Sequence, residues 1–361
     1  MFYHFIAPLN EYLSFLRLFQ YITFRSAYAA VTALILVLIL GNATIKWLRD
    51  LKFKEEIYSL GPQTHKSKTG TPTMGGLIIL GAVLISILLW GNFTNHYLII
   101  VIVGMILLGA LGFVDDYMKS VLKKKNGMSA RMKFLCQLTI AFGVTLVIYL
   151  FPSGGTYTTK LFVPFFNEAV ANLAWFWVVF ATFVIVASTN AVNLTDGLDG
   201  LAIGSILIVA VTLAIMTYLT GHVKIANYLR IPYIPDSAEL TVFISAIIGA
   251  SIGFLWFNSN PATVFMGDTG SLALGGVIGI IAVMIKKEIF LFIVGGVWVL
   301  ETISVIIQVL YFKLMKKRIF KMAPLHHHFE LSGWPEQKVV VRMWILGIIF
   351  AILGLSSLKI L

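Results

Sequence analysis

LTVFISAIIGASIGFLWF, residues 240–257, is a run of eighteen residues without a charged side chain. A helix needs roughly 20 mostly apolar residues to cross a bilayer. Nine further apolar runs lie at about 24–45, 74–91, 97–114, 132–150, 174–191, 200–219, 270–285, 289–311 and 340–358. Together with residues 240–257 they give ten expected spans. Transmembrane strands would instead give alternating segments of about ten residues, so these runs predict helices.

The composition supports a membrane protein. Of the 361 residues, 59% are hydrophobic and only 12% are charged, and the mean hydropathy is +0.92. Soluble domains are about half apolar and about one quarter charged, so they are excluded as a class. We expect an all-α polytopic integral membrane protein with a single transmembrane domain over residues 1–361. The N-terminus lacks a basic n-region, so no cleaved signal peptide is expected.

Cys136 is the only cysteine. An intrachain disulfide is therefore impossible, and a thiolate metal site is not indicated. We interpret Cys136 as a small apolar side chain on a membrane helix.

Basic residues predict the orientation. The connections after the first, third and ninth spans hold six, six and seven of the 27 Lys and Arg residues: Lys46, Arg49, Lys52, Lys54, Lys66, Lys68; Lys119, Lys123, Lys124, Lys125, Arg131, Lys133; Lys313, Lys316, Lys317, Arg318, Lys321, Lys338 and Arg342. Loops rich in Lys and Arg stay in the cytoplasm. This face should be cytoplasmic and both termini periplasmic. It also offers a positive surface for anionic lipid or a phosphorylated substrate.

Polar motifs fall on the same face. KTGTPTMGG (68–76) precedes the second span, GFVDDYMKS (112–120) ends the third, and NLTDGLDGLA (193–202) joins the fifth and sixth. NPATVFMGDTGSLALGG (260–276) joins the seventh and eighth, and APLHHHFE (323–330) lies before the tenth. The outer connections, such as 151–168 and 231–239, have the composition of surface loops or short interfacial elements. This one-sidedness predicts a single site on the cytoplasmic side.

Three acids lie at the ends of expected spans. Asp115 and Asp116 close one span, and Asp268 opens another. Solvated helix ends and N-caps are the simpler roles for such residues, although a carboxylate at a helix C-terminus opposes the helix dipole. Carboxylates gathered from different helices favour a hard cation. Mg²⁺ typically takes one or two carboxylates together with substrate phosphates.

A polar stripe runs through NLTDGLDGLA and the residues before it. Asn190, Asn193, then Asp196 or Gly197, and then Gly200 recur at three- and four-residue spacing, so they share one face if the helix continues past Asn190. Asp196 and Asp199 share a face in the same way, and the glycines beside them let a ligand or another backbone approach closely. The alternative is a hairpin in which Asp199 caps the following helix, but capping explains only one of these residues.

The histidines His326, His327 and His328 are consecutive, so they cannot all face one zinc ion, and no HExxH spacing assists them. We expect phosphate contact or proton handling from them, with exposed histidines of no role as the alternative. Glu301 is an ionisable residue well inside an expected span and needs a polar partner on another helix, which the sequence does not identify.

The sequence allows more than one role for two further motif residues, Lys68 and Phe265. Lys68 stands beside the hydroxyls and paired glycines of GTPTMGG, an arrangement that suits phosphate oxygens but lacks the Walker spacing. Phe265 either packs in the core or provides a stacking surface for a base.

In this order across ten spans, the motifs KTGTPTMGG, DDY, NLTDGLDGLA, NPATVFMGDTGSLALGG and PLHHHFE resemble the phospho-N-acetylmuramoyl-pentapeptide-transferase family. It belongs to the polyprenyl-phosphate N-acetylhexosamine-1-phosphate transferase superfamily. The resemblance covers essentially the whole chain. It implies transfer of phospho-MurNAc-pentapeptide from UDP-MurNAc-pentapeptide to undecaprenyl phosphate, giving UMP and lipid I, with Mg²⁺ as cofactor. It also implies the bacterial cytoplasmic (inner) membrane.

The resemblance assigns roles to individual residues. Asp115, Asp116 and Asp268 are implied as the catalytic and Mg²⁺-linked acids, and Asp196 and His326 as further residues of the active site. The residues implied in substrate binding are Lys68, Thr73, Lys133, Asn190, Asn193, Gly197, Leu198, Asp199, Asn258, Phe265, His327 and His328.

Phosphoryl transfer depends mainly on positioning and charge neutralisation. A phosphate monoester has a second pKa of about 6, so the lipid phosphate is largely a dianion at neutral pH. We therefore favour direct attack by the lipid phosphate, with Asp115 taking any remaining proton. A covalent aspartyl-phosphate route is the alternative.

Other functions compete with this prediction. A related enzyme would transfer GlcNAc-1-phosphate to the same lipid. A secondary transporter would place its site near the bilayer midplane between repeated halves, whereas the motifs here cluster at one surface. A homodimer is compatible with the sequence, and no nucleic-acid partner is expected.

Overall fold

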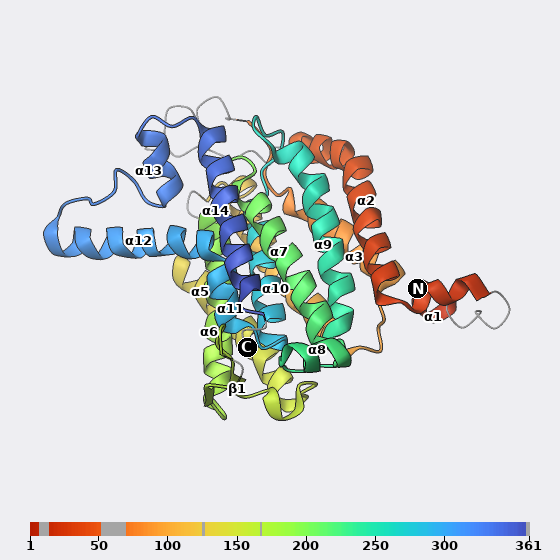
Figure 1. The fold of residues 1–361 in the computed structure, drawn as a ribbon. Coiled ribbons are helices and arrows are strands. Elements are labelled where there is room, and N and C mark those ends of the chain that lie inside the picture. The colour runs from red at the N-terminus through yellow and green to blue at the C-terminus, as the bar shows by residue number, and fades with distance from the viewer. Residues whose placement is uncertain (7–13, 52–69, 125–126, 167, 359–361) are drawn as a thin grey trace.

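The computed structural model describes residues 1–6, 14–51, 70–124, 127–166 and 168–358, which form a bundle of helices (Figure 1). Among these residues, nine helices are long and apolar enough to cross a membrane: α2 (Ile22–Asp50), α4 (His96–Ser120), α5 (Ala130–Leu150), α6 (Phe176–Thr195), α7 (Leu201–Thr220), α9 (Ser237–Asn258), α10 (Gly267–Met284), α12 (Gly296–Met315) and α14 (Glu336–Ser356). α3 (Gly76–Trp90) is apolar but has only 15 residues.

Short elements connect the long helices: α1 (Phe2–Phe5), η2 (Ser14–Gln20), η4 (Gly155–Tyr157), β1 (Lys160–Leu161), β2 (Ala171–Asn172), α8 (Val223–Leu229), α11 (Glu288–Val294) and α13 (Leu325–Leu331). β1 and β2 pair antiparallel, with Lys160 opposite Asn172. Helices thus make up most of the described chain, as the sequence predicts.

α10 is the central helix of the bundle. In its most apolar window, 94% of the residues are buried, and it packs against α4 on one side and α6 on another. Its sequence, GDTGSLALGGVIGIIAVM, is rich in glycine. Small residues let helices approach closely in a membrane, where apolar burial gives little drive for association.

α2 and α9 form the other main helix pair. A Cβ atom on Gly249 would overlap the carbonyl oxygen of Ala30, so only glycine permits this approach. At one end of the pair, Arg25 donates to both carboxylate oxygens of Glu239, at 2.5 and 2.8 Å, and all of these groups are buried. This bidentate ion pair satisfies two charges that would otherwise be costly inside the bundle.

The expected spans correspond to described helices with two corrections. The span expected at 74–91 is α3, whose 15 residues fall short of the roughly 20 that a crossing needs, so nine helices and not ten qualify among the described residues. The single span expected at 289–311 was wrong in its bounds, because the chain breaks at Gly295 into α11 and α12. Gly295 and Gly296 are consecutive, and glycine is a weak helix former. The ring of Phe350 occupies the place where a Cβ on Gly296 would lie. Figure 1 shows α12 running across the direction of the other long helices and out of the bundle.

The two ends of the bundle differ in chemistry. α4, α6 and α9 end where α7 and α10 begin, and we call this the acidic end because it carries Asp115, Asp116 and Asp268. Met1 and the end of α14 lie at the opposite end (Figure 1). The first described residue and the end of α14 are therefore on the side of the bundle away from the acids.

Replacing Gly249 with valine should weaken the α2–α9 contact and lower the melting temperature of the purified protein by several degrees. The reason is the overlap with the Ala30 backbone, which a rigid helix cannot relieve without separating. Gly81→Val is the matched control, because a Cβ at Gly81 meets nothing within 4 Å. Equal melting temperatures for the two variants would contradict this account of the packing.

Candidate active site

Two acids and two lysines form an ion-pair cluster at the acidic end. The Asp115 carboxylate is buried on α4, and Asp268 lies on the first turn of α10. The Lys119 Nζ lies 2.8 Å from Asp115 Oδ2 and 2.6 Å from Asp268 Oδ2. The Lys133 Nζ lies 3.1 and 2.8 Å from the same two oxygens. The two carboxylates therefore converge on a place where positive charge already lies.

Asp116 points in another direction and holds the start of α10. Its carboxylate accepts the backbone N–H groups of Asp268 and Thr269, at 3.1 and 2.9 Å, and the Thr269 hydroxyl at 2.7 Å. The first N–H groups of a helix have no partner within the helix, and its N-terminus favours negative charge. Asp116 thus caps α10 from a different helix.

A close contact between backbones makes this cap possible. A Cβ atom on Gly112 of α4 would overlap the carbonyl group of Asp268, so a side chain there would push the two helices apart. The N-cap alternative for Asp268 is not what the structure contains: α10 begins at Gly267 after Met266, which makes no side-chain cap.

The polar stripe on α6 reaches the cluster. Asn193 Nδ2 donates to Asp268 Oδ1 at 2.5 Å and to Ser271 Oγ at 2.9 Å. Asn190 Nδ2 donates to Gln137 Oε1 of α5 at 2.6 Å. α6 continues helically as far as Thr195, so Asn190 and Asn193 lie on one helix as expected, whereas Asp196 is the C-cap and lies outside it.

The connection between α6 and α7 is tied to two neighbouring segments. Asp196 ends α6 and is partly buried, one turn beyond Asn193. The Asp199 carboxylate accepts the Asn260 amide at 3.1 Å and the Ala262 N–H at 3.0 Å. Gly200 (φ 80°), not Asp199, stands at the N-cap of α7, so the capping alternative fails.

Several residues expected to bind substrate are engaged within the protein. Leu198 is buried in a small apolar cluster with residues of α14. Asn258 accepts the Gly200 N–H and donates to the Val264 carbonyl. Thr73 is buried, and its hydroxyl lies beside Gly267. Phe265 is partly buried, and its backbone pairs with residues 72 and 75.

The three histidines on α13 point to different partners. His326 is buried, and its Nδ1 lies 3.3 Å from Glu301 Oε2 of α12, which identifies the partner of that intramembrane acid. Its Nε2 has no hydrogen-bond partner among the described residues and faces Gly197, where a Cβ would overlap it. His327 contacts Glu330, and His328 accepts the Lys321 N–H. The three rings therefore face different neighbours.

The donor set is compatible with a bound divalent cation. Among the described ranges, no three His, Cys, Asp or Glu side chains form a ready metal group. Asp115 and Asp268 nevertheless direct oxygens to one place, and two carboxylates with substrate phosphates suffice for Mg²⁺. Lys68 lies outside the described residues.

Lys119 is the most informative residue that motif analysis did not single out. The sequence places it only among the basic residues that predict topology and a positive surface, yet it bridges both carboxylates of the cluster. The available signal was its spacing, since Lys119 follows Asp115 by four residues on one helix. Gln137 and Thr269 were missed because their partners come from other helices.

Comparison with known proteins identifies relatives along the whole chain. The model of the family described as Glycosyl transferase family 4 matches residues 98–286. The chain is 50% identical over 361 residues to the phospho-N-acetylmuramoyl-pentapeptide-transferase of Desulforapulum autotrophicum, with 100% of both chains covered. Proteins of the same name from Thermodesulfovibrio yellowstonii and Leptospira biflexa are 51% and 52% identical, with 99% and 97% of both chains covered.

Thr269→Val should lower both the melting temperature and the turnover of the protein. Valine keeps the shape but leaves the buried Asp116 carboxylate short of a hydrogen bond, which destabilises by about 1–3 kcal/mol. Thr269→Ser retains the hydroxyl and should behave as the wild type. Wild-type melting and turnover for Thr269→Val would show that this bond does not hold the acidic end.

Glu301→Leu should reduce kcat by about tenfold to a hundredfold, because misplacing a group at the site by about 1 Å has effects of that size. The residue contacts His326 and not the ion-pair cluster, so Glu301→Gln, which keeps an acceptor, should recover much of the loss. Ser304→Ala on the same helix is the control. Equal losses for Leu, Gln and the control would exclude a positioning role for Glu301.

Proposed function

The chain belongs to glycosyl transferase family 4, and from this premise we propose that it transfers phospho-MurNAc-pentapeptide from UDP-MurNAc-pentapeptide to undecaprenyl phosphate. The products are UMP and lipid I, in the first membrane step of peptidoglycan synthesis. The observation that carries the proposal is the gathering of Asp115, Asp116, Asn193 and Asp268 at one end of a helical bundle whose full-length relatives bear this enzyme name.

The acidic end is proposed to face the cytoplasm. One substrate arrives from water and the other from lipid, so the site belongs at their boundary. The basic residues of the odd-numbered connections favour the cytoplasmic side for this end, and both termini would then be periplasmic. The expected membrane is the bacterial inner membrane, and a homodimer remains a prediction.

Mg²⁺ is the proposed cofactor, with Asp115 and Asp268 as its protein ligands. When bound there, it would neutralise charge on the diphosphate of the nucleotide substrate. Asp116 contributes by fixing the backbone of Asp268, and Asn193 by fixing its side chain. This division of roles refines the expectation that all three acids bind the ion.

Lys119 and Lys133 are proposed to bind phosphate oxygens. In the described arrangement both ammonium groups neutralise the two acids. Because lysine is a point charge on a flexible stem, each can turn toward a phosphate while staying near its carboxylate. His326 presents its unpaired Nε2 to the segment at Gly197 and is proposed to contact substrate there.

Direct attack by the lipid phosphate is the proposed chemistry. One phosphate oxygen forms the new P–O bond while the bond to the UMP oxygen breaks, and Asp115 accepts any proton left on the attacking phosphate. Trapping a phosphorylated Asp115 or Asp116 after exposure to nucleotide substrate alone would replace this route with a covalent one.

The assay that tests the function measures UMP release from purified protein with undecaprenyl phosphate and Mg²⁺. UDP-MurNAc-pentapeptide should support release and give a lipid-linked product, whereas UDP-GlcNAc should not. Release from UDP-GlcNAc alone would assign the chain to the related GlcNAc-1-phosphate transferases. Substrate counterflow in liposomes without any lipid-linked product would instead support a transporter.

Asp196→Asn should abolish turnover in this assay while the protein stays folded, because Asp196 ends α6 next to Gly197 and three residues after Asn193, and we propose that its carboxylate belongs to the active site. Asp50→Asn, an exposed acid at the end of α2, is the matched control and should retain full activity. Wild-type turnover of Asp196→Asn would remove that residue from the site.

A further inference from the structure

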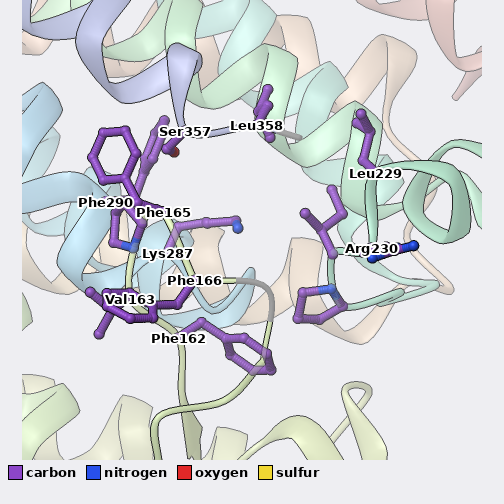
Figure 2. A pocket seen from close by; sticks show the side chains of 13 residues that line it. Phe162, Val163, Phe165, Phe166, Leu229, Arg230, Lys287, Phe290, Ser357 and Leu358 are labelled. Carbon is purple, nitrogen blue, oxygen red and sulfur yellow. The ribbon is translucent and has the colours of Figure 1, made fainter. Parts of the chain in front are cut away.

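A second site candidate lies at the end of the bundle opposite the acids. Residues 162–166, the loop after α8, the α10–α11 turn and the end of α14 line an open hollow, whose empty space together with the solvent at its mouth is about 470 Å³. Figure 2 shows phenylalanine side chains around it, among them Phe162, Phe165 and Phe290, and a lysine extending from one wall. The hollow is aromatic with a cationic group inside.

Lys287 is that cationic group, and its neighbour Lys286 provides an internal comparison. The Lys286 ammonium is buried and fully engaged: it pairs with Glu288 at 2.6 Å, donates to the Thr158 carbonyl at 3.0 Å and lies over the Trp177 ring. The Lys287 ammonium, by contrast, makes no hydrogen bond or ion pair with any described residue, and the side chain reaches into the hollow.

Burial lowers the pKa of Lys287 to about 8, although the nearby carboxylate of Glu288 opposes the shift. The side chain is therefore mostly cationic at neutral pH yet poorly solvated. A partly buried charge of this kind is stabilised by an opposite charge.

A second cation and unusual backbone geometry mark the same place. Arg230 lies on the other side of the hollow, at the end of α8. Arg230 (φ 55°), Phe165 (φ 72°) and Lys286 (φ 59°) all adopt the left-handed region that non-glycine residues avoid. Strained residues of this kind gather at functional sites.

The surroundings of the hollow have the character of a membrane–water boundary. Phe166, on its rim, is 65% exposed, and Trp175 on the neighbouring turn before α6 is 70% exposed. Exposed Trp side chains, such as that of Trp175, concentrate at the level of lipid headgroups. A ligand entering the hollow from the side would come from that layer.

We propose that this hollow binds the phosphate headgroup of an anionic phospholipid, with the ammonium of Lys287 and the guanidinium of Arg230 as its cationic contacts. The phenylalanine walls exclude water from the ion pair and contact the first part of the acyl chains. The site lies at the far end of the bundle from Asp115 and Asp268, so it is separate from the proposed active site.

The test uses the purified full-length protein in a mild detergent, with added phosphatidylglycerol, phosphatidylcholine or inorganic phosphate. Melting temperature and the number of lipids retained in native mass spectra are measured. Phosphatidylglycerol should raise the melting temperature and remain bound, whereas phosphatidylcholine and inorganic phosphate should do neither. Protection by inorganic phosphate equal to that by phosphatidylglycerol would overturn the lipid assignment.

Substitutions in the hollow test whether phosphatidylglycerol binds there. Lys287→Met should weaken phosphatidylglycerol binding about fivefold, which corresponds to about 1 kcal/mol for one lipid-facing cation. Lys287→Arg should retain the binding. Arg230→Asn is a second test and should also weaken phosphatidylglycerol binding. This variant should fold normally, because asparagine tolerates the left-handed backbone and residue 230 is exposed.

Lys224→Met is the matched control, because Lys224 is an exposed lysine on α8 outside the hollow. It should respond to phosphatidylglycerol as the wild type does. The proposal fails if folded Lys287→Met or Arg230→Asn responds to phosphatidylglycerol like the control.

Discussion

The carboxylate of Asp116 determines the position of everything else at the acidic end. It is buried on α4 and accepts the N–H groups of Asp268 and Thr269 that open α10. A rotation or shift of α10 would leave these buried N–H groups and the carboxylate unpaired, a penalty of about 1–3 kcal/mol for each neutral group and more for the charge. The backbone of Asp268 is therefore fixed relative to α4. The Asp268 side chain, on α10, lies opposite the Asp115 side chain on α4.

This constraint depends on how closely the helices can approach. Gly112 leaves room for the Asp268 carbonyl, and Gly76 of α3 leaves room for the backbone of Gly270. In lipid, helices associate through close packing and hydrogen bonds because apolar burial between them contributes little. Glycine contacts and the Asp116 cap thus act together, since the short approach brings the carboxylate within reach of the N–H groups.

At the acidic end, two lysine ammonium groups balance the charge of two carboxylates. Lys119 and Lys133 both contact the Oδ2 atoms of Asp115 and Asp268. Two carboxylates without cations would repel one another, and the two lysine ammonium groups offset that repulsion in the described arrangement. The opposite end of the bundle has the converse character, with Lys287 and Arg230 among aromatic side chains. The long helices between keep these two environments apart.

The sequence by itself determined the class of fold, the placement of nearly all long helices, the concentration of polar motifs at one end and the family, because hydrophobic length and local motifs are properties of contiguous residues. Contacts between distant segments were decided only by tertiary structure. Asp115 and Asp116 are adjacent in sequence, yet they face different partners because successive helical side chains diverge by about 100°. The break at Gly295, the bridging by Lys119 and the pairing of Glu301 with His326 likewise depend on which helices meet. A hydrophobic pattern specifies that a helix is buried in lipid or protein, but not which neighbour it contacts, because many packings bury the same apolar face.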